Sequence, residues 1–241
     1  MRLELIGSGV EPGAGGKLWI RRLRVLLGTL PLAALLVTLA YAAKQYTPPH
    51  VYNAKTYPAR DEHPMEKVTV AADPYDLPEK EDAAFHLKYK ENGFLPILLV
   101  VSNEGEAPIS VMNMKVEYVT GTRRVKLLPA TEDDLYRRFS HLELRGDEPS
   151  RNPLPVPLPR KGPKTGVPAE GREEFQGSMF KAKAVEPHEN QAGFVFFDVQ
   201  GISQPLAGSH LYVTGVKDNN GQELMYFEIA MEKYLTYQPV K

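Results

Sequence analysis

Short apolar runs separated by turn residues dominate the hydrophobic and polar pattern after residue 65. The clearest is FLPILLVVS at residues 94–102, a nearly continuous apolar run that ends at Asn-Glu-Gly-Glu. A strand buried on both faces has this pattern, whereas a strand with one solvent face alternates. We therefore predict a central strand over 94–102, with 109–120 returning beside it as an antiparallel partner.

Further strand signals lie on both sides of this run. Residues 66–72 alternate as a half-buried edge strand does, and residues 192–199 are rich in aromatic residues. The stretch Asp218-Asn219-Asn220-Gly221 separates two alternating runs, and Asn-Gly there favours a hairpin with a type I′ turn. The remaining predicted strands are 123–128, 179–185, 211–216 and 223–229.

One short helix is predicted to begin after Thr131, whose hydroxyl can cap the first turn. The acids that follow it favour the positive end of the helix dipole. About seven strands with turn signals between them are typical of an immunoglobulin-like antiparallel β-sandwich. We therefore predict an all-β fold, with the sandwich over residues 65–241.

The N-terminal segment predicts the compartment. Residues 25–43 form an uncharged apolar run directly after Arg21, Arg22 and Arg24, and this pattern is typical of export with the N-terminus left in the cytoplasm. Two interpretations fit the run: a signal peptide cleaved after Ala40-Tyr41-Ala42, or a retained membrane anchor. Residues 1–24 are then a disordered basic n-region, and the rest of the chain is periplasmic or extracellular.

Two stretches carry no hydrophobic period. Residues 44–64 contain four prolines and predict an extended lead-in. Residues 147–171 read DEPSRNPLPVPLPRKGPKTGVPAEG, and their prolines favour polyproline II, so we predict a surface loop that interrupts the sandwich. Such a loop is either a stiff strap or a contact with a partner.

Composition excludes several functional classes. The chain has no cysteine, which removes disulfides, thiolate metal sites and cysteine nucleophiles. Beyond residue 42 it carries 24 basic and 28 acidic residues. A mildly acidic body without a basic stripe is not typical of a nucleic-acid-binding protein.

Several segments resemble an uncharacterised family of exported bacterial proteins of unknown function. They are GFLPILLVVSNEG, the proline run ending in PLPRK, AVEPHENQAGFVFFDV and PLAGSHLYVTGV. The resemblance covers about residues 52–239 and implies an immunoglobulin-like, extracytoplasmic domain. It implies no activity and no site residues.

Candidate metal ligands are few. Asp61, Glu62 and His63 are adjacent, and Asp73 and Asp76 could join them, but neighbouring residues of an extended chain point to opposite sides. Other candidates have structural interpretations: a turn for His188-Glu189, a hairpin for Asp218 to Glu223, and core packing on one strand face for Met112 and Met114.

No serine lies in a nucleophile elbow and no glycine-rich loop precedes a helix. We therefore assign no catalytic, cofactor-binding or metal-ligating residue and no cofactor. The leading hypothesis is a non-enzymatic binding or assembly module that meets another envelope protein through its sheet edges or its proline-rich loop. The alternative is a periplasmic metal-binding protein that uses Asp61, Glu62, His63 or the Met112/Met114 pair.

Overall fold

The computed structural model describes residues 46–121, 123–146 and 169–236. The chain divides into two units, and the described residues all belong to the second, Tyr46–Lys241. The predicted n-region, the apolar run 25–43 and most of the proline-rich loop lie outside the described residues. Among the helices of the described part, none is long and apolar enough to cross a membrane.

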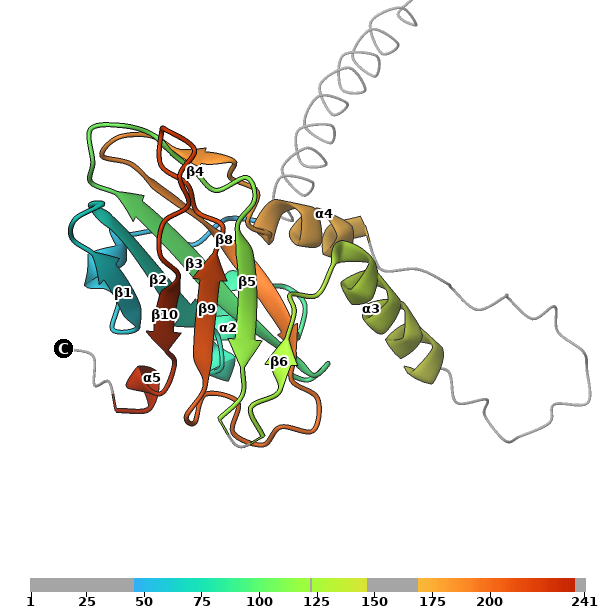
Figure 1. Ribbon diagram of the computed structural model, residues 1–241. Helices are drawn as coiled ribbons and strands as arrows, with labels where there is room; N and C mark the ends of the chain where they lie inside the picture. Colours follow the sequence, from blue (N-terminus) through green and yellow to red (C-terminus); the bar gives the residue numbers. More distant parts are fainter. Residues whose placement is uncertain (1–45, 122, 147–168, 237–241) are drawn as a thin grey trace, which may run out of the picture. The chain divides into compact units, whose positions relative to one another are not determined.

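The first of two four-stranded antiparallel sheets is built around the apolar run predicted as the central strand (Figure 1). All ten residues of that strand are buried, because it has a hydrogen-bonded neighbour on each side and packing on both faces. The strands of this first sheet, in spatial order, are β1 (Arg60–His63), β2 (Val68–Pro74), β3 (Phe94–Asn103) and β8 (Asn190–Asp198).

The second sheet alternates buried and accessible residues along each of its longer strands, so only one of its faces packs on the core. Its strands, in spatial order, are β10 (Phe227–Ala230), β9 (His210–Thr214), β5 (Lys115–Val119) and β6 (Lys126–Leu127). A separate pair joins β4 (Ile109–Ser110) to β7 (Ala184–Val185).

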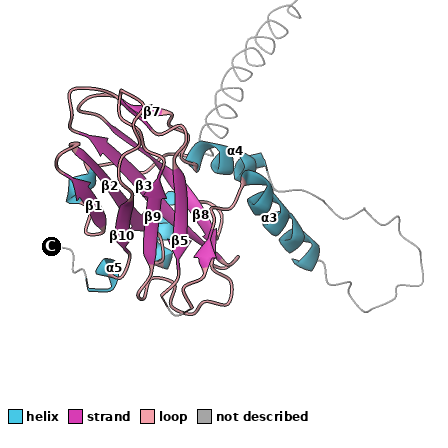
Figure 2. Ribbon diagram, viewed as in Figure 1, coloured by secondary structure: helices cyan, strands magenta, loops and turns pink. Residues whose placement is uncertain are grey.

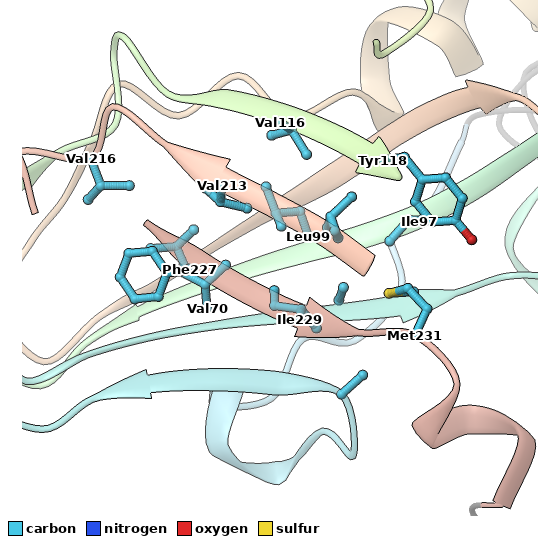
Figure 3. Close-up of a cluster of buried hydrophobic side chains, with 14 of the residues drawn as sticks. Val70, Ile97, Leu99, Val116, Tyr118, Val213, Val216, Phe227, Ile229 and Met231 are labelled. Carbon is cyan, nitrogen blue, oxygen red and sulfur yellow. The ribbon is translucent and has the colours of Figure 1, made fainter. Parts of the chain in front are cut away.

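The two sheets share an apolar core (Figure 3). Ile97 and Leu99 of the first sheet meet Val213 and Ile229 of the second, and all four are fully buried. Because β-strand side chains alternate between faces, the same central strand also presents Leu98 to the opposite side.

That opposite side of the first sheet is covered by helices and by the segment that precedes β1 (Figure 2). The packing there is mainly aromatic: Phe85 contacts Phe194 of β8 and Tyr89 stacks on Phe196 of β8, while Phe139 and Phe175 pack around Tyr89. The helices are η1 (Ala54–Thr56), α2 (Pro78–Ala84), α3 (Glu132–Gly146) and α4 (Ala169–Ser178), with α5 (Lys233–Thr236) near the C-terminus. The described molecule is thus mostly β, with antiparallel sheets and few helices, as predicted.

Two strand predictions are wrong. The stretch 66–72 is not a half-buried edge strand, because β2 lies between β1 and β3 and is buried at all seven residues. The stretch 109–120 does not return beside the central strand. It splits into β4 and β5, and β5 crosses to the second sheet, where it pairs with β6 and β9.

Local details also differ from the predictions. The lead-in 44–64 contains η1 and the edge strand β1. In the turn from Asp218 to Gly221, only Gly221 has a positive φ, so the turn is not type I′, which needs positive φ at both central residues. The predicted helix after Thr131 is present as α3, and Thr131 caps it by accepting from the Asp134 N–H at 3.2 Å. Ten described strands replace the predicted seven or so.

Candidate binding cleft

The candidate metal ligands Asp61, Glu62 and His63 do not converge. Asp61 and His63 share one side of β1 with 3.9 Å between Oδ2 and Nε2, and the His63 ring stacks on Phe227 at 4.0 Å. Glu62 points the other way and accepts from Arg60 Nε at 2.6 Å. The strand alternation therefore separates the three side chains.

Asp73 and Asp76 do not join them, because each carboxylate is paired with a lysine. Asp73 binds Lys80 at 2.5 Å and Asp76 binds Lys90 at 3.0 Å. Across the described residues, no three His, Asp or Glu side chains are grouped so as to hold a metal ion. A hollow of about 350 Å³ beside His63 is lined mainly by charged and polar side chains.

The remaining sequence candidates also lie apart. Met112 is 65% exposed in a turn whereas Met114 packs against the core, so the prediction that both share one strand face is wrong. His188 lies in the predicted turn, 3.3 Å from Glu106. The Asp218 carboxylate accepts from two backbone N–H groups of its own turn.

Both edges of the first sheet are partly covered by neighbouring segments of the chain. The edge strand β1 lies against β10, and the Asp61 carboxylate accepts from the Glu228 N–H at 2.8 Å. On the opposite edge of the first sheet, the Phe194 carbonyl of β8 accepts from the Phe180 N–H at 3.0 Å. Gly193 permits this approach, because a Cβ there would lie 2.4 Å from the Phe180 Cα. These contacts occupy part of each edge of the first sheet.

A cleft of about 790 Å³ with a mixed apolar and polar lining lies at one end of the first sheet. Its floor is Phe94 and Leu95, where β3 begins, and Leu206. One wall is the turn 90–93 that precedes β3, and the other is the loop 199–207 that follows β8. Two segments that are far apart in the sequence thus enclose one cleft.

Arg138 of α3 joins the two walls. Its Nη1 donates to the Asn92 carbonyl at 3.2 Å and to Gln200 Oε1 at 2.8 Å, and its Nη2 pairs with Asp198 at 2.6 Å. The guanidinium also lies over the Phe94 ring at 5.2 Å. A second hollow of about 580 Å³ lies on the α3 side of Arg138. Arg138 therefore lines both hollows and ties the two walls of the larger one together.

Two buried carboxylates position the first wall. Glu81 of α2 accepts from the Lys90 N–H at 2.8 Å, and burial raises the pKa of Glu81. Glu174 of α4, which is fully buried, accepts from the His86 and Leu87 N–H groups at 2.7 and 3.3 Å. The chain leading into the cleft wall is thus held at both sides by carboxylates from separate helices.

The second wall is fixed from the inter-sheet core. The Tyr118 hydroxyl donates to the Pro205 carbonyl at 2.5 Å and lies 2.7 Å from the Ser209 hydroxyl. Burial raises the pKa of Tyr118 to about 12, so the phenol stays protonated at neutral pH. Ser209 in turn donates to the Leu206 carbonyl at 3.0 Å. These groups serve to hold the loop.

Sequence reasoning did not find this cleft. Asp76 is the one predicted ligand that lines it, and there it pairs with Lys90. The sequence signal for this wall was Gly93, a glycine directly before the apolar run, which favours a tight turn there. In the structure Gly93 adopts a φ of +82° in that turn. Arg138 offered none, since an arginine on the accessible side of a predicted helix is usually solvated.

No family model matches the chain, and no curated protein or solved structure shows significant similarity to it.

Proposed function

We propose that this chain is an exported, non-enzymatic binding module that receives a segment of another envelope protein in the cleft beside Arg138. The volume of about 790 Å³ lies within the range of ligand pockets in proteins. The single observation that carries the proposal is the double anchoring of the cleft walls through Arg138. A site whose walls are fixed in advance loses little entropy on binding.

The chemistry of the lining supports binding over catalysis. Arg138 and Lys90 are each paired with a carboxylate, and the floor is apolar. Charges neutralised in this way serve to orient a ligand, and the Glu91 carboxylate in the same lining can accept a hydrogen bond from it. The immunoglobulin-like relationship is part of the same proposal, and two antiparallel four-stranded sheets around one core support it.

A photo-crosslinking residue placed at Ser203, on the cleft wall, tests the partner in living cells. Met65 is the matched control, because it is 92% exposed and precedes β2 near the far end of β3, where Val68 pairs with Asn103. We expect one discrete adduct with an envelope protein from Ser203 and none from Met65. Absence of any adduct, or the same adducts from both positions, contradicts the proposal.

Export is tested separately with a reporter enzyme that is active only outside the cytoplasm, fused after Lys44. We expect an active reporter, because the apolar run 25–43 follows three arginines. A reporter that is made in normal amount but is inactive contradicts export, and with it the envelope partner. It does not test whether the cleft binds a ligand.

A further inference from the structure

The outer face of the second sheet is uncovered in the described part of the chain. The aromatic helical layer packs on the first sheet, and in Figures 1 and 2 no described helix crosses β5, β9 or β10. None of the three hollows described above includes a residue of this face. It is therefore an open, pleated surface, separate from the cleft.

Three aromatic side chains lie next to one another on this face. The Tyr212 ring of β9 lies 6.3 Å from the His210 ring and 6.1 Å from the Tyr226 ring just before β10. Tyr226 is 47% exposed, and the other two are partly exposed. Aromatic rings in contact on a solvent face offer apolar area with defined geometry and little side-chain entropy to lose on binding.

Carboxylates lie on both sides of the central ring. The strand register places Tyr212 between Glu117 of β5 and Glu228 of β10. The Tyr212 hydroxyl donates to Glu228 Oε1 at 2.6 Å, and Lys126 donates to Glu117 at 2.9 Å. The rings are thus bordered by hydrogen-bonding carboxylates, of which Glu117 is paired with a lysine.

This combination favours a carbohydrate over a protein. The centre of a protein interface is depleted of charged residues, yet here two carboxylates adjoin the central ring. A sugar unit has an apolar face of C–H groups, which packs on an aromatic ring, and hydroxyl groups at its rim, which donate to carboxylates. The ring separations are comparable to the repeat of one sugar unit along a glycan.

We propose that the outer face of the second sheet binds a linear glycan chain, with Tyr212 and Tyr226 stacking on successive sugar units. Glu117 and Glu228 accept hydrogen bonds from the hydroxyl groups of the sugar on Tyr212. The open shape of the face suits a polymer that continues beyond the contact at both ends. This site is independent of the cleft and of whatever partner the cleft receives.

Co-sedimentation of the full-length chain with insoluble cellulose, chitin and purified peptidoglycan sacculi tests the proposal. We expect the chain to sediment with at least one of them. Tyr212→Ala and Tyr226→Ala should each weaken that binding about tenfold, the effect of losing one aromatic stacking contact. Tyr212→Phe keeps the ring and should retain most of the binding.

Tyr52→Ala is the matched control. Tyr52 is 58% exposed and contacts a histidine ring, His50, but it lies outside the second sheet. The Tyr52→Ala variant should sediment with the glycan as the unmodified chain does. Failure to sediment with all three glycans, or equal weakening by Tyr52→Ala and Tyr226→Ala, overturns the proposal. A circular dichroism melt of each variant confirms that the sheets are intact.

Discussion

The first sheet has two cores, one on each face, and they are built from different kinds of residue. Between the sheets the packing is mainly aliphatic, with Leu99 and Val213 as examples. Under the helices it is mainly aromatic, with Phe194 4.6 Å from Phe85 and 4.8 Å from Tyr75. The difference shows how one buried strand, β3, supports two layers at once.

The two cores also serve different parts of the molecule. The inter-sheet core fixes the loop wall of the cleft through Tyr118. The aromatic core fixes the turn wall, because α2 and α4 carry the carboxylates that hold residues 86–90. The cleft therefore depends on both cores keeping their positions relative to β3.

Removing a large side chain from each core in turn should have the largest effect on stability. Phe194→Ala removes an aromatic ring from under the helices, and Phe227→Ala removes one from between the sheets. Both side chains are almost fully buried, at 1% and 0% exposure, so each change should cost about 3–5 kcal/mol of unfolding free energy. Urea denaturation measures both.

The shape of those unfolding transitions shows whether the two cores unfold together. Because β3 contributes to both cores, we expect one cooperative transition in each variant, with far-UV and near-UV circular dichroism changing together. If the near-UV signal of Phe194→Ala is lost at lower urea than the far-UV signal, the helical layer unfolds on its own and the two cores are not coupled.

Hydrophobic patterning predicts the inter-sheet core better than the aromatic one. Leu99 belongs to a continuous apolar run and Val213 to an alternating one, and both patterns are local. Phe175 is an isolated aromatic residue among polar ones, Phe85 lies in a short irregular stretch without a strand pattern, and only the tertiary fold brings the two into one core. Local pattern also could not show that β5 crosses to the second sheet, since strand pairing is non-local.

The candidate site was less predictable for the same reason. Its walls come from residues 90–93 and 199–207, and no motif links two turns so far apart. Sequence proximity grouped Asp61, Glu62 and His63, yet the alternation of β1 divides them. The glycan-binding face was likewise visible only once the register aligned Tyr212 with Glu228.

A smaller effect is expected from the carboxylate that fastens α4 to the cleft wall. Glu174→Ala leaves the partly buried His86 and Leu87 N–H groups without their acceptor, at a cost of roughly 1–2 kcal/mol. Glu174→Gln keeps one acceptor oxygen and should cost about half as much. Chemical denaturation measures both, and hydrogen exchange at the two amides should accelerate in the alanine variant.

If Glu174→Ala leaves stability and the exchange of these two amides unchanged, α4 does not hold this wall. The helical layer would then cover the first sheet without positioning the cleft. Such a result would weaken the link between the aromatic core and the proposed binding site, while the inter-sheet core and the Tyr118 contact would stand.

The smallest effect, and the most specific, concerns Glu81 at the other side of the same wall. Burial raises its pKa above the value of the unfolded chain, so the folded protein binds the proton more tightly. Its contribution to stability therefore falls as pH rises from about 4.5 through the folded pKa, and it levels off above that.

Glu81→Gln removes this titration and keeps an acceptor for the Lys90 N–H. The difference in unfolding free energy, variant minus unmodified chain, should rise across that pH window, as urea denaturation from pH 4 to 8 would measure. Asp134 titrates in the opposite sense and below this window, because hydrogen bonds from Thr131 lower its pKa from 3.8, so its contribution is lost only as pH falls further. A difference that stays flat across the window would mean that Glu81 holds the cleft wall without a desolvation cost.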